Sequence, residues 1–203
     1  AITNTTLLAL ISSVLIVIVA ISLIFGERTN RFKSINHFIS LATVGYAIPG
    51  AIIAVSMLFF LSNIKMHFGI FAFGTIFVLI YAYNIRFMAT AYTPIKSATE
   101  KLGMSSFESS RLLGYGNIKS FLKIEYPILQ PAILTALLLS VVEILKELPL
   151  TLVLRPFNFE TVSSIAYHYA INEMVKEASI YSLSIVVISL LPIIVFVKSK
   201  KSL

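Results

Sequence analysis

The chain has 203 residues, of which 58% are hydrophobic and only 12% charged, and its mean hydropathy is +0.93. This composition excludes an ordinary soluble domain and indicates a membrane protein. The net charge of +7 does not point to nucleic acid, because in a membrane protein the positions of Lys and Arg matter more than their sum.

Five apolar stretches are each long enough to cross a bilayer, which takes about 20 residues. They predict spans at about 7–25, 39–62, 68–91, 126–147 and 178–197. None of them shows the period-two alternation of a membrane barrel, so the predicted fold is all-α and transmembrane, with one domain over residues 1–203. The chain starts at Ala1 rather than Met, and we expect a fragment or the C-terminal half of a longer protein.

The second predicted span carries Pro49 and Gly50 near its middle. Proline lacks the amide that the helical ladder needs, and glycine lacks a side chain, so the helix should kink or loosen here. The kink has two readings: a hinge, or a static packing feature of the kind that membrane helices tolerate.

The segment at about 92–125, between the third and fourth spans, carries helix punctuation and is therefore predicted to be folded. Gly103 ends one helical stretch, and Ser105–Glu108 has the pattern of a capping box, so a short helix should start near Ser106. Gly114 and Gly116 should end it with positive φ. Such a helix is either a simple connector or a rigid element that transmits force to another protein.

Residues in and after this helix follow a recognisable order: Glu108, Ser109, Ser110, Arg111, Gly114, Ile124 and Pro127. The pattern resembles the coupling-loop signature of binding-protein-dependent ABC importer permeases, which usually reads Glu-Ala-Ala, three residues, Gly, nine residues, Ile, any residue, Leu-Pro. Here both alanines are serine, and Tyr126 stands where leucine is usual. The resemblance implies a five-helix permease core whose loop sits in a groove of a cytoplasmic ABC ATPase subunit.

Two further segments, 46–50 and 146–159, resemble the ferric-iron branch of these permeases. The resemblance covers roughly residues 39–197. It implies a periplasmic substrate-binding protein and a second permease half or subunit as partners, in the bacterial inner membrane.

On the fourth span Ala132, Ala136 and Ser140 recur every four residues and should form a groove for another helix. Continuing at 100° per residue would bring Glu143 and Glu147 to the same face. Candidates for the translocation path or its gate are six residues: Pro49, Gly50, Glu143, Lys146, Glu147 and Pro149. An alternative is that Glu143 and Lys146 only pair with each other at the membrane boundary.

Several chemistries are excluded. No glycine is followed by lysine, so a Walker-type phosphate loop is absent, and the chain has no aspartate for a Ser-His-Asp set. The chain also lacks cysteine. Consecutive residues such as Tyr167–Tyr169 cannot all face one ion, so we predict no metal site, no cofactor and no catalytic residue. ATP hydrolysis must then come from a partner.

Basic residues divide unequally between the two sides of the predicted membrane. Of the 16, the following 12 fall in residues 26–38, 86–125 and 198–203: Arg28, Arg31, Lys33, Arg86, Lys96, Lys101, Arg111, Lys119, Lys123, Lys198, Lys200 and Lys201. The positive-inside rule places this set in the cytoplasm, with the N-terminus of the chain outside and the C-terminus inside.

The leading hypothesis is the permease subunit of an ATP-driven importer of ferric iron or an iron chelate. Related importers of thiamine, polyamine, phosphonate or sulfate are alternatives, since recognition belongs mostly to the binding protein. A secondary transporter would show paired charges or unwound helices near the midplane. The sequence places the acidic residues near the ends of the spans, which argues against that class. A membrane scaffold would not explain the coupling signature.

Overall fold

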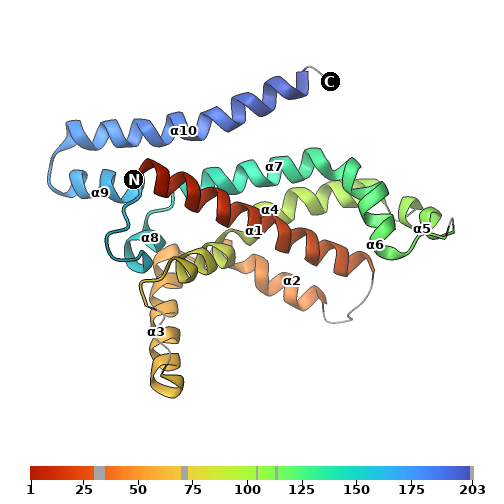
Figure 1. Ribbon diagram of the computed structural model, residues 1–203, viewed down its shortest axis with the longest axis horizontal. Coiled ribbons are helices and arrows are strands. Elements are labelled where there is room, and N and C mark those ends of the chain that lie inside the picture. The colour runs from red at the N-terminus through yellow and green to blue at the C-terminus, as the bar shows by residue number, and fades with distance from the viewer. Residues whose placement is uncertain (30–34, 70–72, 104, 113, 202–203) are drawn as a thin grey trace.

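The computed structural model describes residues 1–29, 35–69, 73–103, 105–112 and 114–201. In these ranges all regular elements are helical and there is no strand. The long helices are α1 (Ile2–Arg28), α4 (Ile76–Leu102), α7 (Tyr126–Leu145) and α10 (Val175–Lys201). Helices α1, α4 and α7 contact one another in a bundle, and α10 runs along its outer side (Figure 1).

Shorter elements connect them: α2 (Ile35–Val44), the 3-10 turn η1 (Gly45–Ala47), α3 (Gly50–Phe68), α5 (Ser105–Leu112), α6 (Asn117–Ser120), the π-helical turn η2 (Phe121–Glu125), α8 (Pro149–Leu154) and α9 (Val162–Ile171). Among the described residues, three helical stretches have the length and composition to cross a membrane: Ile2–Arg28, Gly50–Phe68 and Asn117–Leu145. The predicted all-α transmembrane fold class is confirmed. The count of five spans stays a prediction.

Small side chains form the centre of the bundle. Ala9 and Ala20 of α1, Ala82 of α4 and Ala136 of α7 are all completely buried. Residues without long side chains let helix backbones approach closely, which is how helices associate where lipid removes the hydrophobic drive. Ser140, one turn beyond Ala136, is also buried, and its hydroxyl lies 3.0 Å from that of Thr90 on α4. The small-residue face predicted for the fourth span is therefore a packing surface.

The second predicted span is not one helix. The chain leaves the helical conformation at Ile48 (ψ 130°) and Pro49 (ψ 135°), and α3 begins afresh at Gly50. The expected kink is thus a complete break. Helix α3 then runs steeply across the direction of the bundle (Figure 1).

The third span also differs from its prediction of 68–91. Helix α4 begins only at Ile76 and continues through Arg86 and Pro94 to Leu102. The charge at Arg86 does not end the helix, because it is paired inside the protein. The loop was expected to start at residue 92. Because α4 continues to Leu102, the loop starts only at Gly103.

Candidate functional site

The segment from Gly103 to Glu125 caps one end of the bundle, where α1 ends and α7 begins (Figure 1). Gly103 has φ 71° and ends α4, as predicted. Helix α5 starts at Ser105, in agreement with the expected helix. The side chains of Ser105 and Ser106, and with them the capping box, lie outside the described residues, and so does the side chain of Arg111.

Helix α5 has a buried face and an exposed face. Phe107 and Ser110 are 2% and 1% exposed, whereas Glu108 and Ser109 are exposed. The Ser110 hydroxyl donates to the Phe107 carbonyl at 2.6 Å and shares a hydrogen bond with the hydroxyl of Ser120 at the end of α6. Of the two serines in the signature, Ser110 therefore fastens α5 to α6, and Ser109 is left at the surface.

The two glycines after α5 have different conformations. Gly114 has φ 84°, in the left-handed region that favours glycine, as predicted. Gly116 has φ −70° and ψ 160°, so the prediction of positive φ there is wrong. Gly116 is the extended residue that precedes α6, a conformation open to any residue.

Arg28, the last residue of α1, joins four elements at this end. Its guanidinium forms an ion pair with Glu125 and donates to the carbonyls of Gly103 at 2.5 Å and Thr99 at 3.4 Å. It also lies 5.9 Å from the ring centre of Phe107, at cation–π distance. The side chains of Arg28 and Glu125 are 8% and 0% exposed. The α5 segment is thus attached to α1 through a buried charge.

Neighbouring charges add to this attachment. Glu27 of α1 pairs with Lys96 of α4 and accepts a hydrogen bond from the Tyr92 hydroxyl at 3.1 Å. The ends of α1 and α4 are therefore joined by one ion pair and one hydrogen bond, both to Glu27.

The turn η2 explains why Glu125 points inward. Pro127 has no amide to donate to the carbonyl four residues earlier, at Lys123, and the backbone widens into a π-helical turn just before it. Of the signature residues here, Ile124 is half-buried and Pro127 exposed.

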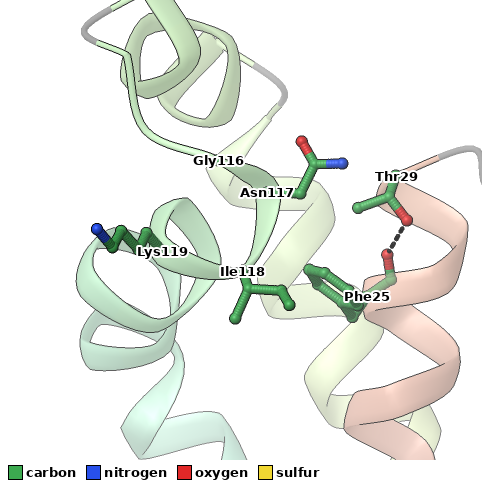
Figure 2. Close-up of a pocket in the computed structure, with 6 residues that line it drawn as sticks. All are labelled: Phe25, Thr29, Gly116, Asn117, Ile118 and Lys119. Carbon is green, nitrogen blue, oxygen red and sulfur yellow. Dashed lines mark hydrogen bonds between the residues drawn. The ribbon is translucent and has the colours of Figure 1, made fainter.

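An open groove of about 470 Å³ separates α6 from the end of α1 (Figure 2). Its lining residues are Phe25, Thr29, Gly116, Asn117, Ile118 and Lys119. Thr29 donates to the Phe25 carbonyl at 2.9 Å, and Lys119 extends away from the other five (Figure 2). The Phe25 ring meets Phe121 edge-on at 5.3 Å. The attachment of this segment to α1 therefore rests on Phe25–Phe121 and on Arg28.

A second cluster lies inside the bundle at the break before α3. Arg86 of α4 donates to Glu147 Oε2 at 3.1 Å and to the carbonyl of Ile48. Glu147 Oε1 accepts the amide of Leu150 at 3.2 Å. The Arg86 and Glu147 side chains are 20% and 7% exposed. A Cβ on Gly50 would lie 2.7 Å from Glu147 Oε1, so this glycine leaves room for the carboxylate.

The depth of this cluster corrects two sequence predictions. Arg86 is 13 residues from Thr99 on the same helix, hence about 20 Å from the Arg28 end at 1.5 Å per residue. Arg86 therefore lies deep in the bundle and not at the end of α4 near Lys96 and Lys101, with which the charge division had grouped it. Glu147 is not on the face of Glu143 either, because α7 ends at Leu145 and the chain then turns inward.

The remaining path candidates lie at the surface of this region. Glu143 pairs with Lys146 at 2.7 Å, the alternative considered for these two residues. Lys146 is 57% exposed. Pro149 is exposed and opens α8. The structure thus brings Gly50 and Glu147 together and leaves Glu143, Lys146 and Pro149 outside the cluster.

The opposite end of the bundle is held by α1 and the segment before α9. The Asn4 amide donates to the Glu160 carbonyl at 3.2 Å, and Val162 donates its amide to the Thr5 hydroxyl at 2.9 Å. Arg155 pairs with Glu160 and keeps the pKa of that carboxyl below its ordinary value. Tyr169 stacks on Tyr181 of α10 at 5.4 Å, which accounts for one of the aromatic residues considered for a metal.

Sequence reasoning missed Arg28 and Arg86 as site residues. Their partners are 97 and 61 residues away, a separation that no local pattern reports. One signal was present for Arg86: a single arginine that follows an apolar sequence, with no glycine or proline between it and Pro94.

No family model matches the chain. It is 24% identical over 198 residues to the Fe(3+)-transport system permease protein FbpB 2 of Haemophilus influenzae. The match covers 98% of this chain and 38% of that protein, so the chain spans well under half the length of its relative. The chain thus resembles a permease of an Fe(3+)-transport system, which confirms the resemblance found in the sequence.

Proposed function

We propose that this chain is a permease domain of a bacterial ABC importer and not an enzyme. The observation that carries the proposal is α5, a short helix with the exposed residues Glu108 and Ser109. It is attached to α1 by the contact of Arg28 with Phe107 and to α6 by the hydrogen bond of Ser110. A rigid attachment lets a partner that binds α5 transmit its movement to the membrane-spanning helices. The signature residues Gly114, Ile124 and Pro127 lie in the same segment.

The partners follow from this role. A separate cytoplasmic ABC ATPase subunit docks on α5 and hydrolyses ATP, a periplasmic binding protein delivers the substrate, and a second permease half completes the pathway. The chain then lies in the inner membrane, with its N-terminus outside and its C-terminus in the cytoplasm. We place Pro49, Gly50 and Glu147 on or beside the translocation path.

The proposed substrate is ferric iron or an iron chelate. Support comes from the name of the Haemophilus relative and from the resemblance of residues 146–159 to the ferric-iron branch. Thiamine, polyamine, phosphonate and sulfate are the competing substrates.

One observation favours a second function. The break at Ile48–Pro49 and the Arg86–Glu147 pair give this chain the interrupted helix and paired internal charges of a secondary transporter. Glu147 does follow the end of α7, as the sequence argument had it, but its carboxylate is buried and paired with Arg86.

Reconstitution separates the two functions. The full protein is placed in liposomes with its cognate ATPase and binding protein, and uptake of radiolabelled ferric iron is measured with ATP and, separately, with a proton or sodium gradient. Uptake that requires ATP and the ATPase supports the importer. Gradient-driven uptake without the ATPase contradicts it, and ATP-driven uptake of another solute would correct only the substrate.

A further inference from the structure

Helix α3 is packed against the rest of the chain from its start to Leu61, where Ile53, Ala54, Met57 and Leu61 are buried. Its main contacts are with α8, and it contacts α4 less. Beyond Leu61, Met66 and Phe68 are 79% and 75% exposed. The helix has the length and composition to cross a membrane, yet it runs steeply across the bundle (Figure 1). If α1 and α7 span the bilayer, α3 can span it beside them only after turning about its start.

The start of α3 directly follows the break at Ile48–Pro49. A broken helix frees carbonyl groups, and in low dielectric each needs a new donor. Arg86 supplies that donor to Ile48, and through Glu147 it reaches the start of α8. One guanidinium therefore connects α4 to the break and to the helix on which α3 packs.

Glu147 adds a direct constraint on α3. Gly50 is the first residue of α3, and even a methyl group on it would lie 2.7 Å from the Glu147 carboxylate and 3.4 Å from the Arg86 guanidinium. The start of α3 thus packs against the ion pair itself. A change in the geometry of the pair must therefore change the packing of α3.

We infer that Arg86 is a positioning residue that holds α3 across the bundle, and that α3 turns about the Ile48–Pro49 break when the Arg86–Glu147 pair opens. That this turn is a step of transport rests on the proposed function. The turn itself is a property of the chain and needs no ATPase to be observed.

The test uses thiol reactivity in the full-length protein in membranes, in a background without other cysteines. Ala54 of α3 and Ala136 of α7 are both completely buried. Ala54→Cys reports on the packed part of α3, and Ala136→Cys reports on the bundle. Each is combined with Arg86→Gln, Glu147→Gln or Gly50→Ala, and the rate of reaction with a small membrane-permeant maleimide is measured.

We expect the rate at position 54 to rise by about tenfold or more in all three backgrounds, because breaking a buried ion pair is strongly destabilising. The rate at position 136 should not change. Gly50→Ala is informative because it alters no charge and because alanine favours a helix more than glycine does. If Gly50 affected only the stability of α3, the reaction rate at position 54 would not rise in this variant.

Glu160→Gln is the matched control, since it removes a carboxylate from the more exposed pair with Arg155. It should change neither rate. An unchanged rate at position 54 in Glu147→Gln overturns the inference. An equal rise at both positions also overturns it, because that result describes general loosening. Failure of ATP-driven uptake, by contrast, would contradict only the proposed function.

Discussion

The carboxylate of Glu125, completely buried at the start of α7, is paired with the guanidinium of Arg28 at the end of α1. The pair brings together two residues that are 97 positions apart. It is surrounded by Gly103 and Phe107, so the segment that carries α5 meets the bundle at this point. Its removal should therefore affect stability and coupling together.

Arg28→Met should destabilise the protein by about 3–5 kcal/mol, because it leaves the Glu125 carboxylate buried without its partner. The double variant Arg28→Met/Glu125→Leu should recover most of that loss, since an apolar pair of similar volume needs no charge compensation. Thermal unfolding in detergent measures both. A double variant as unstable as the single one would show that the backbone hydrogen bonds of Arg28, and not the ion pair, hold this end.

Glu108→Gln tests the exposed face of α5. Glutamine still serves at this position of a capping box, so the helix should remain while the charge offered to a partner is lost. We expect the affinity for the cognate ATPase to fall by roughly tenfold, about 1.4 kcal/mol. Co-purification and a binding titration measure it. Unchanged affinity would remove Glu108 from the proposed contact.

Gly114→Val and Gly116→Val form a matched pair. Nothing lies within 4 Å of a Cβ at either position, so the two variants differ only in backbone conformation. At φ 84° a β-branched residue is strongly disfavoured, whereas φ −70° suits it. Gly114→Val should therefore abolish most ATP-driven uptake with normal membrane insertion, and Gly116→Val should retain it. Equal activity of the two would contradict the role of the turn after α5.

Ala136→Leu should harm assembly more than Leu137→Ala. Ala136 is completely buried in the bundle and Leu137 only partly, so the first change forces extra volume into a filled space, at a cost of about 1–3 kcal/mol. The fraction of protein that elutes as a single species from gel filtration compares them. Equal recovery of the two variants would mean that this face tolerates added volume.

Orientation is tested by single cysteines. With a membrane-impermeant thiol reagent on intact cells, Asn158→Cys should react, while Ser105→Cys and Lys200→Cys should be protected. The physical basis is the excess of Lys and Arg at the α5 end. Labelling of Ser105→Cys from outside would reverse the orientation and rule out a cytoplasmic coupling segment.

Local patterns predicted the features that depend on neighbouring residues. The uniform apolar run at 7–25 lies within α1, Gly103 ends α4, and Gly114 has the positive φ expected of it. Pro49 does interrupt its helix. Each of these depends on a few adjacent residues, because backbone conformation and helix ends are decided within one turn.

Features that depend on distant partners were not predictable in the same way. A lone charge beside an apolar run usually marks the end of a span, and Arg86 was assigned by that rule. It lies inside the bundle because Glu147 compensates it, and Glu147 reaches it only because α7 ends two residues earlier. The wrong prediction at Gly116 has a local cause. Glycine permits positive φ but does not require it, so the residue type alone does not decide the conformation.

The π-helical turn η2 decides which side chains of this segment face the end of α1. Ser120 and Glu125 are five residues apart and both completely buried, whereas in an α-helix that spacing would set them about 140° apart around the axis. The turn therefore acts as a one-residue insertion that brings both side chains into phase. A relative that has lost one residue between these positions should present a different side chain to the end of α1. We expect such a relative to lack an arginine there as well, so that deletion and charge loss occur together in evolution.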